Sequence, residues 1–392
     1  MIRGRTHNRA RLFIGGLFVV AASAAVSFLL LKATYPTYLV EPVMVMNTQV
    51  QAEESIDLSW PDYGQAAVAT EHGGVIATNG SQSPYPTAST AKIITVLAVL
   101  EKKPLGSGEQ GPTLTMTEQD VMSYNEYVSQ NGTNTPVYAG LKLTQYQAIQ
   151  SILLRSSNNM SDTLATWSFG SLEAYHTFAN EMVRRMGATH TTVAADASGL
   201  SAETTSTATD MARISLEALK HPVIAEIAAQ SHADIPFAGQ IQNSNFLLEN
   251  QEITGLKTGE TVEAGGNFLL SALHSHGGQS QQVVVVVYGA PLAITAMTDS
   301  YALYKSVIPR LTYEQIGTEG QVVARYGLPE GVTYEAVLSR SINTWLWAGE
   351  ALHFEVDARP VTHQTQVCGT AGVVRYQQNS VPLQVRSVGY SC

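Results

Sequence analysis

Charged residues, lysines and cysteines are all scarce in this chain of 392 residues. Charged side chains make up 14% and hydrophobic side chains 44%, a balance typical of a globular protein and not of a disordered one. The formal net charge of -10 argues against a nucleic-acid partner, because such proteins present a basic surface. Since the chain has only eight lysines, each lysine within a motif is informative.

Metal-ligand patterns are equally scarce. The two cysteines, Cys368 and Cys392, lie near the C-terminus without the spacing of a zinc site. An oxidising compartment would allow a disulfide between them, closing a loop of about two dozen residues and contributing roughly 3 kcal/mol. His274 and His276 form an isolated pair without neighbouring carboxylates, which we interpret as polar loop residues. We therefore expect no metal and no cofactor.

The N-terminus predicts a membrane anchor. Residues 1–11 contain four arginines, and the next twenty residues, 12–31, contain no charge, which is long enough to span a bilayer. Because positive charge tends to stay in the cytoplasm, we expect a cytoplasmic tail over 1–11 and a single-pass transmembrane helix over 12–31. Residues 32–55 lack a clear period and are predicted to form a stalk, which places the remaining chain outside the cytoplasm.

A cleaved signal peptide is the alternative interpretation of this segment. Residues 22–24, Ala-Ser-Ala, resemble a small-residue cleavage site. The apolar run continues beyond them to Leu31, which favours the uncleaved anchor.

Beyond the stalk, residues 56–308 mix strand and helix patterns. A Gly-Gly turn predicts a hairpin over 65–78, and the five valines of 283–287 predict a buried central strand. A helix over 294–307 is expected to close this domain. In residues 309–392 helical periodicity fades and short alternating segments predict a small all-β domain. Further helices are predicted over 93–100, 144–169, 172–186 and 207–219.

Ser89 and Lys92 stand immediately before the apolar segment 93–100, which is typical of a buried helix. Residues three apart share a helix face, so the lysine amine can lie beside the serine hydroxyl. Serine needs a base to become a nucleophile, and lysine can be that base only if its pKa falls by about three units through burial and nearby positive charge. The helix N-terminus also offers a backbone N–H to an oxyanion. A capping serine with an exposed lysine is the alternative.

Ser156 and Asn158 lie within the predicted helix 144–169. Residues two apart do not share a helix face, so we expect a turn or break there that directs both side chains into a cleft. An ordinary polar surface is the alternative for this tripeptide taken alone.

A third motif runs from Lys257 through Thr258 and Gly259 to Glu260. We interpret it as a strand whose glycine lets a substrate backbone lie close. Lys257 and Thr258 are candidates to bind a substrate carboxylate, and the backbone N–H of Glu260 is a candidate second oxyanion donor. A strand end followed by a turn would explain Gly259 but not a buried lysine.

The order S-x-x-K, S-x-N, K-T-G resembles the signature of β-lactamases and penicillin-binding proteins. The segments 85–92, 196–200, 207–212 and 243–248 are similar to the low-molecular-mass D-Ala-D-Ala carboxypeptidases, and the resemblance covers roughly residues 65–290. It implies an α+β fold, with a transpeptidase-like domain made of a five-stranded antiparallel sheet, flanking helices and an all-helical lobe. One departure is Ser157, where these enzymes often have glycine.

The resemblance also implies an activity, the removal of the terminal D-Ala from peptidoglycan stem peptides. Ser89 would form the acyl-enzyme with Lys92 as general base, while Ser156 and Asn158 would relay the proton and hold the substrate amide. The motif from Lys257 would bind the terminal carboxylate. The implied partners are the stem peptide, β-lactams as inhibitors and the membrane, with the catalytic domain on the extracytoplasmic side.

Three other functions use the same motifs or the same fold. A class A β-lactamase would add a glutamate after the second motif, but residues 189–201 contain none. A DD-endopeptidase acting on cross-links shares the chemistry and cannot be separated from a carboxypeptidase by these residues. A non-catalytic β-lactam- or wall-binding module is the third, and the presence of every motif residue argues against it.

Overall fold

The computed structural model describes residues 40–45, 49–50, 57–327, 331, 333–347, 352–360, 370–378 and 381–390. The predicted anchor over 12–31 and both cysteines, Cys368 and Cys392, lie outside these residues, so the anchor and the disulfide stay predictions. Among the described helices, none has the length and hydrophobicity needed to cross a membrane. The predicted domain boundaries also stay predictions.

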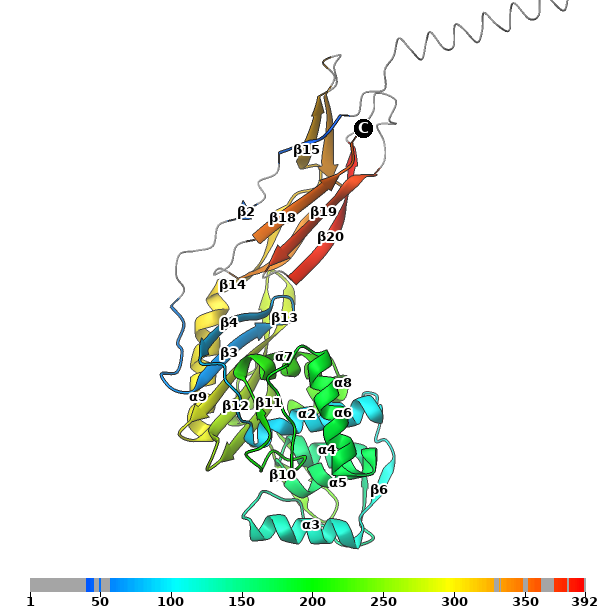
Figure 1. The fold of residues 1–392 in the computed structure, drawn as a ribbon, viewed down its shortest axis with the longest axis vertical. Coiled ribbons are helices and arrows are strands. Elements are labelled where there is room, and N and C mark those ends of the chain that lie inside the picture. The colour runs from blue at the N-terminus through cyan, green and yellow to red at the C-terminus, as the bar shows by residue number, and fades with distance from the viewer. Residues whose placement is uncertain are drawn as a thin grey trace, which may run out of the picture.

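A five-stranded antiparallel sheet forms the centre of the molecule, in the order β11-β12-β13-β3-β4 (Figure 1). The predicted hairpin and the predicted central strand both belong to it, which confirms the expected α+β fold. Its strands are β3 (Gln65–Thr70), β4 (Gly74–Gly80), β11 (Ile253–Thr261), β12 (Gly265–His276) and β13 (Gln279–Ala290).

Both faces of the central strand β13 are covered, which explains its unbroken run of valines. Val284 and Val286 pack into the core shared with the helices α2 (Lys92–Lys102) and α7 (Ala208–Leu219). Their neighbour Val285 faces the opposite side and packs in the core formed with α9 (Ala293–Val307). Side chains alternate between the two faces of a strand, so a strand buried on both sides has no polar position.

The helical lobe packs against one face of the sheet and surrounds α2, whose residues Lys92 to Leu100 are all buried. The predicted helical stretch 144–169 is two helices, α4 and α5, and the break between them lies at the second motif, where the spacing of Ser156 and Asn158 led us to expect one. The lobe contains α3 (Glu118–Ser129), α4 (Gln145–Leu153), α5 (Asn158–Phe169), α6 (Leu172–Arg185) and α8 (Pro222–Ala228). The short elements of the lobe and of its junction with the sheet are β5 (Tyr85–Pro86), η1 (Ala88–Ala91), β6 (Thr113–Thr115), β7 (Lys142–Thr144), β8 (Thr205–Ser206), β9 (His232–Ile235) and β10 (Gly239–Gln242). The short helix η2 (Phe246–Glu249) packs in the core on the α9 side of the sheet.

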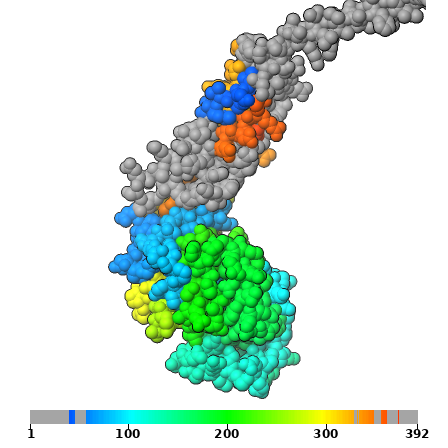
Figure 2. All heavy atoms as spheres, in the orientation of Figure 1, coloured from blue at the N-terminus to red at the C-terminus, as the bar shows by residue number. Residues whose placement is uncertain are grey.

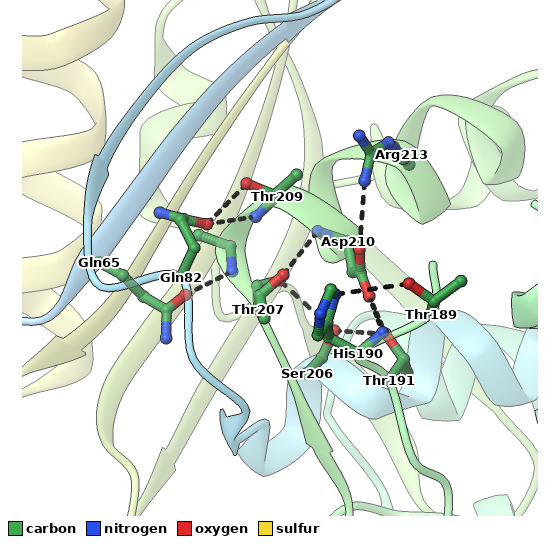
Figure 3. A network of polar contacts seen from close by, with 11 residues as sticks. Gln65, Gln82, Thr189, His190, Thr191, Ser206, Thr207, Thr209, Asp210 and Arg213 are labelled. Atoms are coloured by element: carbon green, nitrogen blue, oxygen red, sulfur yellow. Dashed lines mark hydrogen bonds and ion pairs between the residues drawn. The ribbon is translucent and has the colours of Figure 1, made fainter. Parts of the chain in front are cut away.

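A polar network ties the start of α7 to the rest of the domain (Figure 3). Asp210 is buried and accepts hydrogen bonds from the His190 backbone N–H at 2.7 Å and the Thr191 hydroxyl at 3.2 Å. The amides of Gln65 and Gln82 accept the first backbone N–H groups of α7. Side chains thus satisfy the unpaired donors of this helix N-terminus, which holds α7 against the sheet.

The C-terminal strands form a second β structure beyond α9. β14 (Leu311–Gly317) pairs with β17 (Ile342–Trp347), and Trp345 and Trp347 pack into the same core as α9. The remaining described strands form one sheet in the order β1-β15-β16-β20-β19-β18-β2. They are β1 (Val43–Met44), β2 (Gln49–Val50), β15 (Val322–Gly327), β16 (Thr333–Leu338), β18 (Leu352–Ala358), β19 (Thr370–Gln378) and β20 (Val381–Tyr390).

Two features of this region differ from the sequence expectations. β1 and β2 come from the segment expected to be an irregular stalk, and they pair with β15 and β18 at the two edges of the second sheet. His274 and His276 lie in β12 and not in a loop, and each ring bonds the backbone of β14. Figure 2 shows the cyan and green helical lobe at the bottom of the view and the orange C-terminal residues well above it.

We predict that Asp210→Ala lowers the free energy of unfolding by about 3 kcal/mol, because it leaves several buried donors without an acceptor. Arg213→Ala is the matched control. It removes the exposed partner of the same carboxylate, 3.2 Å away, and should cost less than about 1 kcal/mol. Urea unfolding of both variants measures the difference, and equal losses would contradict this account.

Candidate active site

The first motif places Ser89 in η1 and Lys92 at the first position of α2. In a 3-10 helix, residues three apart are eclipsed, which brings the two side chains together more closely than an α-helix would. The Lys92 amine lies 2.8 Å from the Ser89 hydroxyl. Ser89 is partly exposed, whereas Lys92 is 0% exposed.

Two further oxygen atoms hold the Lys92 amine, Asn158 Oδ1 and the backbone carbonyl of Ser198, each at 2.8 Å. Both can only accept hydrogen bonds. A neutral amine has two N–H donors and one lone pair, so donating to these two oxygens leaves the lone pair for the Ser89 hydroxyl proton. The geometry therefore fits a lysine that accepts a proton from serine.

Burial lowers the pKa of Lys92 to about 7, with the carboxylates of Asp196 and Asp162 acting in the opposite direction. The sequence analysis expected nearby positive charge to assist, but desolvation is the principal cause. A pKa near neutrality gives the amine a substantial unprotonated fraction at physiological pH.

The second motif lies at the break between α4 and α5. Ser156 has a left-handed backbone, with φ of 66°, and Ser157 is the N-cap of α5. Because of this turn, Ser156 lines the cavity beside Ser89, whereas the Asn158 side chain accepts a hydrogen bond from the Lys92 amine in the buried part of the site. The buried Ser157 hydroxyl donates to Asn159 Oδ1 at 2.8 Å. The side chain present here in place of the glycine common in the related enzymes is thus satisfied by a hydrogen bond.

The third motif lies on β11, against the turn that carries Ser89. A Cβ atom on Gly259 would lie 3.0 Å from the backbone nitrogen of Ser89, so a side chain here would press on the nucleophile. Thr258 Oγ1 lies 2.8 Å from Ser244 Oγ, which comes from the segment before η2. The Glu260 carboxylate accepts the backbone N–H of Ala293 at the start of α9.

Lys257 is buried on β11 beside the cavity. It is 1% exposed, and its amine donates to the backbone carbonyl of Thr258 at 2.9 Å. Burial lowers its pKa well below the usual value, and the charge of Lys92 lowers it further. Lys257 is not among the residues that line the cavity in front of Ser89.

This cavity has a volume of about 440 Å3 and lies between η1, the α4–α5 turn and β11. The predicted residues divide into a group that lines it and a group, Lys92, Asn158 and Lys257, that lies beneath its surface. The lining group is Ser89, Ser156, Thr258, Gly259 and Glu260.

Sequence reasoning included residues 196–200 in the resemblance but assigned no role to the residues that orient the Ser198 carbonyl. The Asp196 carboxylate accepts from the backbone N–H groups of Ser198, Gly199 and Ser201, which fixes the turn. Asp162 accepts from the backbone N–H of Ala197 at 2.9 Å, and burial raises its pKa to about 6. An aspartate shortly before a Ser-Gly pair, as in Asp196-Ala197-Ser198-Gly199, is typical of a turn that is closed by the aspartate side chain. This pattern could have indicated the role of Asp196.

The model of the D-alanyl-D-alanine carboxypeptidase family of peptidases matches residues 64–291, more than half of the chain. The chain belongs to this family. The match favours a D-Ala-D-Ala carboxypeptidase, a serine peptidase, over the β-lactamase alternative, and it contains all eight predicted site residues.

Two curated proteins and one solved structure illustrate what this chain is similar to. D-alanyl-D-alanine carboxypeptidase DacB2 of Mycobacterium tuberculosis is 28% identical over 229 residues, 56% of this chain and 72% of the relative. A D-alanyl-D-alanine endopeptidase of Pseudomonas aeruginosa is 24% identical over 210 residues, covering 52% of this chain and 64% of the relative. A peptidoglycan synthesis regulatory factor of Streptococcus pneumoniae shares the fold, with a TM-score of 0.63 and 20% identity, over 86% of this chain and 99% of that one.

We predict that Gly259→Ala slows acylation of the protein by a fluorescent penicillin by about tenfold to a hundredfold, since a small displacement of a reacting group is costly. Gly327→Ala in β15 is the control, because its Cβ would meet no atom within 4 Å. Time courses of acylation, quenched at successive times for both variants, give the acylation rates. Equal rates would show that the close approach of β11 to Ser89 is unimportant.

Proposed function

We propose that this protein is a serine-type D-alanyl-D-alanine carboxypeptidase that removes the terminal D-Ala of peptidoglycan stem peptides. The observation that carries the proposal is the buried Lys92 amine, held by two acceptors and 2.8 Å from the Ser89 hydroxyl. A serine beside an unprotonated amine is an activated nucleophile.

In the proposed acylation step, Ser89 Oγ attacks the carbonyl carbon between the last two D-alanines, and Lys92 takes the hydroxyl proton. The backbone N–H groups of Ser89 and Glu260 would stabilise the oxyanion. Collapse of the tetrahedral intermediate breaks the peptide C–N bond. The leaving D-alanine takes a proton, relayed through Ser156, and Asn158 holds the substrate amide.

Deacylation reverses these roles. A water molecule attacks the ester carbonyl and gives its proton to Lys92, and Ser89 leaves with a proton as the free hydroxyl. The hydrolysis balances with these groups and one water molecule. The penultimate D-Ala becomes the new C-terminus of the stem peptide.

An endopeptidase that cleaves cross-linked stem peptides is a second candidate. The relative from Pseudomonas aeruginosa bears that name, and the same serine and lysine would do the chemistry. Offering a stem pentapeptide and a cross-linked dimer side by side separates the two activities.

We further propose that the catalytic domain lies on the outer side of the cytoplasmic membrane, held by residues 12–31. The charge-free run of twenty residues after four arginines supports this placement. Mass spectrometry of the mature protein tests it, since loss of the first two dozen or so residues would indicate a cleaved signal peptide instead.

We predict that a fluorescent penicillin labels the wild-type protein covalently and that Ser89→Ala abolishes the label. Ser129→Ala, at the exposed end of α3, should label normally. D-alanine release from a stem pentapeptide should follow the same pattern. A folded wild-type protein that takes no label would favour the non-catalytic wall-binding module.

We predict that the acylation rate rises with pH through about 7 and levels off above it, because only the unprotonated Lys92 amine accepts the serine proton. Lys92→Arg keeps a permanent charge and should lower the rate by about a thousandfold. Rates measured from pH 5.5 to 8.5 test this, and a profile that is flat in the wild type would remove Lys92 as the base.

A further inference from the structure

Arg155 is an exposed cation that lines the cavity in front of Ser89. It lies in the α4–α5 turn, directly before Ser156. Within the described part of the chain it forms no ion pair and no hydrogen bond. A guanidinium without a counterion in a catalytic cleft is available to an anionic group of a ligand.

The turn that carries Arg155 is fixed beside the third motif. The carbonyl of Leu154 accepts the backbone N–H of Ser244 at 3.1 Å, and the Ser244 hydroxyl bonds Thr258 Oγ1 at 2.8 Å. These two contacts join the helical wall of the cavity to the sheet wall at the Thr258 hydroxyl. The Arg155 side chain therefore starts next to the end of the cavity where Thr258 lies.

The other charged groups near this end are poorly suited to hold an anion. Lys257 lies beneath the surface with its amine bonded to Thr258, and burial lowers its pKa. Glu260 also lines the cavity, and its negative charge would repel a carboxylate. Arginine keeps its charge in such a setting and presents a planar pair of donors that matches a carboxylate.

We infer that Arg155, together with the Thr258 hydroxyl, binds the terminal carboxylate of the substrate's last D-alanine. This inference rests on the proposed function. It gives the exposed Arg155 the role of binding the carboxylate, for which the sequence motif had suggested Lys257. It makes Arg155 a specificity residue for peptides with a free C-terminus.

The test compares two peptides that differ only at their C-terminus, one ending in D-Ala-D-Ala with a free carboxylate and one ending in D-Ala-D-alaninamide. The ratio of their kcat/KM values is measured for the wild type, Arg155→Gln and Arg155→Lys. Arg184→Gln on α6, which removes the same charge from a site outside the cavity, is the matched control.

We expect Arg155→Gln to lower the carboxylate-to-amide ratio by roughly tenfold, Arg155→Lys to lower it less, and Arg184→Gln to keep it. An Arg155→Gln variant that keeps the wild-type ratio overturns the inference. A ratio that falls equally in Arg184→Gln also overturns it, since that would indicate a general effect of net charge.

A second measurement does not depend on peptide hydrolysis. It compares the rates at which a penicillin and its methyl ester acylate the protein. The ratio of these two rates should also fall about tenfold in Arg155→Gln. A wild type that is acylated but releases no D-alanine would refute the proposed function, and the ester comparison would still decide the role of Arg155. Equal sensitivity to esterification in both proteins would refute that role.

Discussion

The environment of one buried amine determines how the rest of this domain is arranged. Lys92 has no contact with solvent, so three oxygen atoms from three separate segments must replace water around it. Those segments are the nucleophile turn, the start of α5 and the loop closed by Asp196. Each of these segments packs against the apolar core of the helical lobe. A large hydrophobic core is therefore needed to position a small polar cluster.

The central sheet forms the opposite wall of the cleft and holds that wall in a fixed position. β11 lies at the edge of the sheet next to η1, and a Cβ atom at position 259 would force η1 to shift, since it would lie 3.0 Å from the backbone nitrogen of Ser89. On the other side of the sheet, α9 fills the second core and receives the Glu260 carboxylate at its N-terminus. The strand that faces the substrate is therefore supported from behind, which limits its movement during the reaction.

Much of this arrangement could be predicted from the sequence, because it rests on local patterns. The valine run predicted the central strand, and the separation of Ser156 from Asn158 predicted the helix break. The Ser198 carbonyl could not be predicted, since any residue has one and its direction depends on the fold. Arg155 belongs to no motif, and its position in the cleft follows from a tertiary contact between Leu154 and Ser244. The sequence indicated a buried lysine at position 257, but it could not indicate that the amine bonds the backbone carbonyl of Thr258, which depends on the fold of β11.

The pairing of β1 and β2 with the second sheet has a consequence for the reach of the enzyme. Residues 43–44 and 49–50 are edge strands of a sheet whose other strands come from beyond residue 320. At its described strands, the segment that precedes the catalytic domain is therefore paired with the C-terminal strands β15 and β18. With the proposed anchor at residues 12–31, the distance from the membrane to the cleft would be set by strand pairing in this sheet and not by the contour length of a free tether.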